Sequence, residues 1–314
     1  RQDWSDALLA RAGIDRAKLP RPVASGTLAG TVSDAAADAL GLPRGVAVVV
    51  GGHDQCCNSL GAGIDRAGRA VCGIGTVECI TPTYDHIPPA AAMLACGLNV
   101  EHHLLPGLYV SFLYNQAGSL VRWFRDTFAA ADRRLLPEGA DVFDALAAEM
   151  PAGPTRLLVL PYFEPVGTPH FITDSAGAVV GLKTATTRGE ILKAIMEGVA
   201  FYFVESLDSL RRMEIDTSEF VATGGGARSD AWLQIQADVF GVPFVRPAIT
   251  ECSVLGAAML AGVATGEFAS PAEAVARFVR RDRVFEPDAA RHAAYAERIA
   301  RYRQLYPALK GILT

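Results

Sequence analysis

The chain is organised around Gly51-Gly52-His53-Asp54-Gln55, a segment that places a carboxylate directly after an apolar run. That run, Val46-Ala47-Val48-Val49-Val50, is β-branched and uncharged, which predicts a buried strand. The two glycines allow a sharp turn and close approach of a ligand to the backbone. Ligands in open α/β sheets bind beyond the carboxyl ends of strands, so Asp54 lies where a catalytic carboxylate is expected. Asp54 would equally suit the N-cap of a helix starting near Gln55, and the segment alone leaves both interpretations open.

The composition is that of an ordinary folded protein, with half of the 314 residues hydrophobic and a fifth charged. The net charge is −5, and no Lys/Arg cluster precedes the C-terminal segment, so nucleic acid is not a predicted partner. No apolar run approaches the roughly eighteen residues of a membrane span. The six cysteines form no C-x-x-C pair, so we predict no zinc or other metal site and no disulfide framework. Reduced, buried thiols in a cytoplasmic protein are expected.

Alternating strand and helix patterns after residue 150 predict an α/β fold. Earlier in the chain, Ala70–Ile74 and Val77–Pro82 read as a hairpin around the turn Gly75-Thr76. Further strands are predicted at Met93–Asn99, Leu108–Tyr114, Leu157–Leu160, Phe220–Ala222 and Phe244–Arg246. Helices are predicted at Ala117–Phe128, Val142–Met150, Arg188–Met213, Ser229–Phe240 and Cys252–Thr265, and the Arg-rich segment Pro271–Leu313 is also expected to be helical.

A run of three glycines, Gly224-Gly225-Gly226, lies between a predicted strand and the helix that begins near Ser229. Such a loop gathers backbone N–H groups at the positive end of a helix, which suits a phosphate or a nucleotide. Neither the G-x-G-x-x-G nor the G-x-x-x-x-G-K-[ST] pattern is present. A tight turn with Ser229 as N-cap would explain one glycine, but three favour close approach of a ligand.

The hairpin turn Gly75-Thr76 is the second candidate phosphate site, because it offers a hydroxyl and backbone N–H groups. By itself it is weak evidence, since Gly and Thr are common in turns. Together, a carboxylate, a Thr-Gly turn and a glycine loop are the parts that phosphoryl transfer needs, with Asp54 as the base for an acceptor hydroxyl.

One spaced pattern resembles a known family. Gly177-Ala178-Val179-Val180-Gly181-Leu182, followed by Glu190-Ile191 and Ala194-Ile195-Met196-Glu197, is similar to the C-terminal signature of the FGGY carbohydrate kinases. Around it, Gly51–Gln55 resembles that family's catalytic-Asp segment and Gly75-Thr76 its phosphate-contacting turn. Pro161-Tyr162 and Thr168-Pro169-His170 resemble the loop before the signature, Thr223–Ser229 the adenosine loop, and Glu251 with Gly256-Ala257-Ala258 the segment that closes the nucleotide site.

The resemblance implies an actin-like ATPase (ribonuclease H-like) α/β fold with a mixed sheet flanked by helices. It implies Asp54 as catalytic residue, His53, Asp54 and Gln55 at the substrate, and Gly75, Thr76, Gly224, Gly225, Gly226 and Ser229 at the nucleotide. It also implies ATP and Mg²⁺, with a sugar or polyol acceptor, and leaves a homodimer open. Residues 1–68 would be the end of the N-terminal domain, 69–268 the C-terminal nucleotide-binding domain, and 269–314 a helical tail. The D-x-G-T/S strand-turn of the N-terminal domain is not found, so we expect that domain to be missing and this chain alone to be inactive.

The acceptor is the least determined feature. A ketopentose such as xylulose is favoured, although Glu164-Pro165-Val166-Gly167 replaces the Gly-Glu-Arg of many xylulokinases. Asp54-Gln55 resembles the Asp-Gln pair of glycerol kinases, so a glycerol or erythritol kinase is one alternative, and an actin-like scaffold without acceptor chemistry is another. Ala185 stands where glycerol kinases have a nucleotide-contacting glycine, so that contact is not inferred.

Six further polar residues have ordinary structural interpretations. His53 would contact the substrate, orient Asp54 or simply pack in its loop. Glu78 is either a site carboxylate or a paired surface residue, and the second is favoured. Glu251 is expected to cap the helix from Cys252. The arginines of the tail (Arg280, Arg281 and Arg283) are expected on a solvated helix face.

Overall fold

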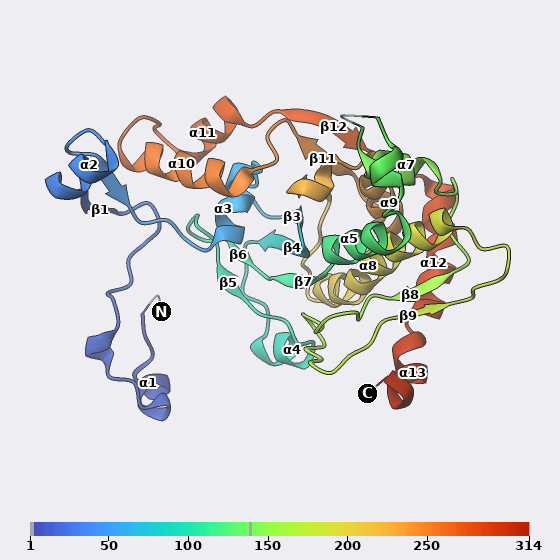
Figure 1. Cartoon of the computed structure of the whole chain (residues 1–314). Helices are drawn as coiled ribbons and strands as arrows, with labels where there is room; N and C mark the ends of the chain where they lie inside the picture. The colour runs from blue at the N-terminus through green and yellow to red at the C-terminus, as the bar shows by residue number, and fades with distance from the viewer. Residues whose placement is uncertain (1–2, 138–139, 314) are drawn as a thin grey trace.

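The computed structural model describes residues 3–137 and 140–313 (Figure 1). Its centre is an eight-stranded mixed sheet in the order β12-β11-β10-β3-β4-β6-β5, with β7 also paired to β4. The strands are β3 (Arg69–Ile74), β4 (Val77–Tyr84), β5 (Glu101–His102), β6 (Tyr109–Val110), β7 (Leu113–Gln116), β10 (Glu219–Thr223), β11 (Phe244–Pro247) and β12 (Arg281–Phe285). Strand β10 runs parallel to β3 and to β11, whereas β3 is antiparallel to β4. The predicted hairpin and the mixed α/β sheet are both confirmed.

Helices cover both faces of this sheet, so its central strands are buried on both sides. On one face, Ala70, Cys72 and Ile74 of β3 join the main hydrophobic core. The helices there are α5 (Gly118–Phe128), α7 (Val142–Ala148), α8 (Arg188–Arg211), α9 (Asp230–Phe240) and α12 (Ala289–Tyr302). On the other face, Val71 packs with Val221, Val245 and Cys252. The helices on that side, drawn above and to the left in Figure 1, are α3 (Asp54–Gly61), α10 (Cys252–Ala264) and α11 (Pro271–Phe278).

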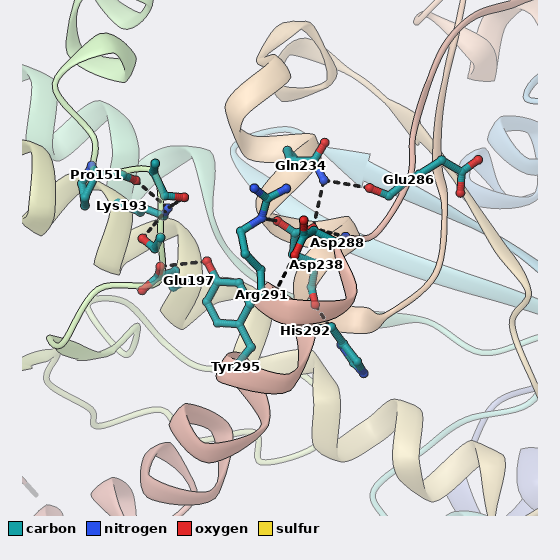
Figure 2. Close-up of polar contacts among 12 residues, drawn as sticks. Pro151, Lys193, Glu197, Gln234, Asp238, Glu286, Asp288, Arg291, His292 and Tyr295 are labelled. Atoms are coloured by element: carbon teal, nitrogen blue, oxygen red, sulfur yellow. Dashed lines mark hydrogen bonds and ion pairs between the residues drawn. The ribbon is translucent and has the colours of Figure 1, made fainter.

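The 24-residue helix α8 contributes many of the buried residues of the main core. It begins with a capping box in which Thr187 and Glu190 bond each other's backbone N–H groups. One turn further on, the Lys193 ammonium donates to the carbonyls of Pro151, Ala152 and Gly153 at 2.7, 3.2 and 2.8 Å (Figure 2). Glu197, another turn along, accepts from the Tyr295 hydroxyl of α12 at 2.9 Å. These buried contacts fasten α8 to the segment after α7 and to α12.

Helix α9 is joined to α12 by the other half of the network in Figure 2. The buried carboxylate of Asp238 accepts from Arg291 at 2.6 Å and from the Asp288 N–H at 2.8 Å. Asp238 Oδ1 also accepts from Gln234 Nε2 at 2.9 Å, and the same Gln234 nitrogen donates to the Glu286 carbonyl. The loop between β12 and α12 is therefore held against α9.

The residues before α3 form a small separate layer. Strands β1 (Leu28–Thr31) and β2 (Ala47–Val49) make an antiparallel pair outside the large sheet, with α2 (Asp34–Leu40) between them. The remaining N-terminal elements are α1 (Asp6–Ala12) and a 3₁₀ turn, η1 (Arg16–Lys18). The prediction that Val46–Val50 forms a buried strand is only half right: the strand exists, but Val48 is 43% exposed. Among the described residues its only sheet partner is β1, and none of residues 46–50 is fully buried.

Two other expectations need correction. Residues 93–99 do not form a strand, because α4 (Ala90–Ala95) begins after Pro89 and its alanines are strong helix formers. The C-terminal tail is not wholly helical: β12 pairs antiparallel with β11 and extends the sheet. Arg281 and Arg283 therefore lie on an edge strand, where charged side chains deter pairing with another chain. Short elements complete the fold: α6 (Asp132–Leu135), β8 (Leu158–Leu160), β9 (Ala178–Val180), η2 (Gly225–Arg228) and α13 (Leu305–Leu313).

None of the helices in the described residues has the length and apolar character needed to cross a membrane. All six cysteines are free, and four of them are buried.

Candidate active site

Asp54 is the first residue of α3, and His53, not Asp54, occupies the N-cap position. The Asp54 side chain is 73% exposed, and its Oδ1 accepts the Gln55 N–H at 2.8 Å. His53 Nδ1 lies 3.0 Å from the same oxygen, and the imidazole stacks on Phe112 at 4.5 Å between ring centroids. Asp54 therefore bonds a backbone N–H at the start of the helix and is also largely exposed. His53 ends the strand-to-helix turn, and the Asp54 carboxylate faces open space.

That open space is a cleft of about 440 Å³ at the edge of the large sheet. Its walls come from five parts of the chain. They are the start of α3 (His53, Asp54, Gln55, Asn58), the β3–β4 hairpin (Gly73, Gly75, Val77, Cys79), the residues around β7 (Phe112, Tyr114), and the two loops that follow β10 and β11 (Thr223, Gly224, Thr250, Glu251, Cys252, Ser253). All three residues predicted at the substrate line this cleft.

A second cavity, of about 480 Å³, lies beside the first and contains most residues predicted at the nucleotide. Thr76, Gly225, Gly226 and Ser229 line it, and Gly75 lines both cavities. Gly224 lines only the first cavity. Other parts of the wall are formed by Trp232 of α9, Leu192 and Met196 of α8, Val121, Arg122 and Arg125 of α5, and Asp141, Phe143 and Asp144 at the start of α7. The two cavities thus meet at the hairpin turn.

The glycine loop packs on β3 in a way that only glycine allows. Gly224 has a φ of +77°, a backbone conformation that L side chains rarely adopt. A Cβ on Gly226 would lie 2.3 Å from Ile74 Cγ2, whereas a Cβ on Gly225 would meet nothing within 4 Å. Gly225 therefore leaves room on the side of the loop that faces the second cavity. Ser229 caps α9 by accepting the Trp232 N–H at 3.3 Å, so the structural role considered for it is also present.

The hairpin turn is held in place by the start of α5. The Gly118 N–H donates to the Gly75 carbonyl at 3.1 Å, and a Cβ on Gly118 would lie 2.3 Å from that oxygen. The Arg122 guanidinium donates to Thr76 Oγ1 at 3.2 Å. This bond does not use the hydroxyl hydrogen, so Thr76 keeps an O–H that can donate to a ligand in the cavity that it lines. Sequence reasoning missed Arg122, although its position one turn into the helix after β7 places it beside the turn.

Two buried polar residues were also missed or misjudged. Asn58, one turn after Asp54, donates to Thr223 Oγ1 at 3.0 Å and so joins α3 to the start of the glycine loop. Its spacing of four residues from Asp54 was the available signal. Glu78 was expected at the surface, but it is fully buried and bonded to Gln236. Glu251 stands at the N-cap of α10, although its side chain makes no capping bond.

No group of three or more His, Cys, Asp or Glu side chains suited to a metal ion occurs within residues 3–137 and 140–313.

The mixed sheet with helices on both faces is the actin-like ATPase fold that the resemblance implied. The chain aligns with the crystal structure of xylulose kinase from Rhodospirillum rubrum at a TM-score of 0.81 and 30% identity. This alignment covers 98% of the chain and 61% of the other protein. The fold also matches that of Plasmodium falciparum glycerol kinase with ADP, at a TM-score of 0.77 and 20% identity over 96% of this chain and 59% of that one.

Sequence comparison then gives the family. The model of the C-terminal domain of the FGGY family of carbohydrate kinases matches residues 74–265, and that of the N-terminal domain matches residues 1–61. The chain belongs to the FGGY family of carbohydrate kinases. The expectation that the N-terminal domain is missing is corrected by the second match, which places part of that domain before Ala62.

Two curated relatives illustrate the spread within the family. Xylulose kinase from Bacillus subtilis (strain 168) is 30% identical over 315 residues, covering 100% of this chain and 60% of the relative. Autoinducer-2 kinase from Escherichia coli (strain K12) is 31% identical over 328 residues, covering 99% and 60%. The chain spans about 60% of the length of these relatives.

Proposed function

We propose that this protein transfers the γ-phosphoryl group of ATP to a hydroxyl of a sugar or polyol. The observation that supports this most directly is the meeting of the two cavities at Gly75. One cavity holds an exposed carboxylate, and the other is lined by the glycine loop and Thr76. A nucleotide in the second cavity would point its phosphates toward the cleft that contains Asp54.

In this proposal Asp54 accepts the proton of the acceptor hydroxyl, which increases the nucleophilicity of its oxygen. His53 and Gln55 line the same cleft and would contact the acceptor. ATP supplies the phosphoryl group, and Mg²⁺ supplies positive charge on its phosphates when both are bound. The Thr76 hydroxyl and the Arg122 and Arg125 guanidiniums would bind phosphate oxygens, and Gly224, Gly225 and Gly226 with Ser229 would line the adenosine side.

A ketopentose such as xylulose is the favoured acceptor, since xylulose kinases are among the relatives of comparable identity. The autoinducer-2 kinase relative has similar identity, so the acceptor must be measured directly. A homodimer and a cytoplasmic location are further predictions from the sequence. The domain boundaries after residues 68 and 268 are likewise proposed.

The experiment is coupled ADP release by the full-length gene product with xylulose, ribulose, fuculose, erythritol and glycerol as acceptors. Strong stimulation by one compound, lost in Asp54→Asn, is the expected result. The 314-residue chain is assayed alongside to learn whether it acts alone. ADP binding without stimulation by any acceptor would instead favour a nucleotide-binding scaffold, and absence of ADP binding would refute the nucleotide site.

A further inference from the structure

Two buried side chains behind the loops of the second cavity have oxygens that lack a hydrogen-bond donor. Glu78 of β4 and Gln236 of α9 are both fully buried, and Gln236 Nε2 donates to Glu78 Oε1 at 2.8 Å. The other two oxygens of the pair, Glu78 Oε2 and Gln236 Oε1, are buried without any hydrogen-bond partner. Buried polar atoms are nearly always paired, so two orphaned acceptors on side chains that already touch require an explanation.

A single proton on Glu78 would give both of these oxygens a hydrogen-bonding role. A protonated carboxyl has one O–H donor in addition to its acceptor oxygen, and a primary amide has both N–H donors and a carbonyl acceptor. The two groups can therefore pair through two hydrogen bonds at once. One is the observed bond from Gln236 Nε2 to Glu78 Oε1, and the other would run from the Glu78 O–H to Gln236 Oε1.

The surroundings favour the neutral form of Glu78. Burial raises the pKa of this carboxyl to about 7, and its bonds from Gln236 and Cys72 only partly offset the increase. The Cys72 thiol of β3 lies 3.4 Å from Glu78 Oε1, and burial raises its pKa well above the usual value. Cys79, next in β4, has a pKa raised to about 12 by burial. From β7, the residue paired with Glu78 is Asn115, an uncharged amide.

The position of this pair links the two loops of the nucleotide cavity. Glu78 follows the hairpin turn by two residues, and Gln236 lies two turns into the helix that starts directly after Ser229. Their contact thus connects the strand after the hairpin turn Gly75-Thr76 to the helix after the glycine loop. Ionisation would place a carboxylate oxygen and an amide oxygen together in a dry core, where neither has a donor, and would weaken that contact.

We propose that Glu78 carries a proton and, doubly bonded to Gln236, acts as a positioning residue that holds the two nucleotide loops together. The inference rests on the proposed function to the extent that these loops bind ATP. The inference goes beyond the chemistry of the cleft, because it predicts that nucleotide affinity falls when the buried Glu78 carboxyl ionises.

The test uses Glu78→Gln, because a glutamine reproduces the protonated acid and cannot ionise. Its amide can donate to Gln236 Oε1 while its carbonyl accepts from Gln236 Nε2. ADP affinity is measured by calorimetry for the full-length protein and this variant from about pH 6 to about pH 9, a range that spans the Glu78 pKa. The ratio of the two dissociation constants cancels the titration of ADP itself. We expect a ratio near one at the acid end and a several-fold weaker wild type at the alkaline end.

The double variant Glu78→Gln/Gln236→Glu serves as the matched control. It exchanges the acid and the amide. It should therefore bind ADP at acid pH and, like the wild type, bind it more weakly at alkaline pH. A constant ratio across the range, or equal weakening by Glu78→Gln and Glu78→Leu at acid pH, would overturn the proposal. Failure of the wild type to bind ADP at any pH would refute the proposed function instead.

The proton itself has an independent readout in stability. A carboxyl whose pKa is raised by folding binds more protons in the folded than in the unfolded state between the two pKa values. The free energy of unfolding of the wild type relative to Glu78→Gln should therefore fall as the pH rises from about 4.5 to about 7, and level off above that. A difference that does not change with pH in this window would show that Glu78 does not hold the proton.

Discussion

Gly61 of α3 and Gly256 of α10 lie where the two helices cross, with their backbones in contact. A Cβ on Gly61 would lie 1.9 Å from the Cys252 carbonyl oxygen, and a Cβ on Gly256 would lie 1.9 Å from the Cys57 carbonyl oxygen. Neither clash could be relieved by rotating a side chain, because both involve backbone atoms. This crossing fixes the helix whose first residue is Asp54, and it accounts for the run of small residues along α3.

Gly61→Ala should consequently destabilise the protein and also displace Asp54. Overpacking of this kind typically costs about 1–3 kcal/mol, and a backbone clash belongs at the upper end. Urea unfolding measures the loss, with Gly153→Ala as the control, since a Cβ there meets nothing within 4 Å. Equal stability of the two variants would mean that the helices do not cross this closely.

Asp54→Asn should lower turnover by about 10²–10⁴-fold, the range associated with loss of a general base. The affinity for ADP should stay unchanged, because Asp54 lines the first cavity and not the second. Steady-state kinetics and calorimetry check the two halves of this expectation. Asp38→Asn, at an exposed carboxylate of α2, is the control and should behave as wild type. Undiminished turnover in Asp54→Asn would remove Asp54 from the role of base.

The two glycines that follow Gly224 should respond differently to alanine. Gly225→Ala adds a methyl group in open space that faces the second cavity, so it should keep the melting temperature and weaken ADP binding about tenfold. Gly226→Ala drives a methyl group into Ile74 and should lower the melting temperature as well. Thermal unfolding and calorimetry separate these effects. Normal ADP affinity in Gly225→Ala would place the nucleotide elsewhere.

Lys193→Met should cost roughly 1.5–3 kcal/mol of unfolding free energy, since it removes a charged donor shared by three backbone carbonyls. It also removes the cation that lowers the raised pKa of the buried Glu197 carboxyl. Denaturant unfolding measures the effect, and Lys183→Met at an exposed site is the comparison, expected within about 0.5 kcal/mol of wild type. A loss no larger than that of Lys183→Met would assign the Lys193 bonds little net value.

Local patterns predicted the parts of this fold that are locally determined. The hairpin around Gly75-Thr76, helix α8 and the Ser229 cap all follow from residue spacing, turn residues and capping chemistry. The strand expected at residues 93–99 failed because apolar residues in a short segment suit a strand or a helix equally well. The strand in the tail was missed because pairing with β11 overrides the helical preference of an Arg-rich segment.

The site was predictable wherever its residues belong to a motif. Asp54 and the glycine loop stand out in the sequence, and the structure places them around adjoining cavities. Arg122, Asn58 and Glu78 do not stand out, because their roles depend on contacts across 46, 165 and 158 positions of the chain. A carboxylate in a strand reads as a surface residue until the helix that covers it is known.

The crossing of α3 and α10 also determines where this chain can bend. Asp54 is part of the same rigid unit as α10, since α3 and α10 contact each other through backbone atoms at Gly61 and Gly256. Gly51 lies just before that helix, and a Cβ there would meet nothing within 4 Å. If the β1–β2 layer swings over the cleft, Gly51 is the natural hinge. Asp54 would then keep its position relative to Gly75 and Thr76 while the first cavity opens and shuts.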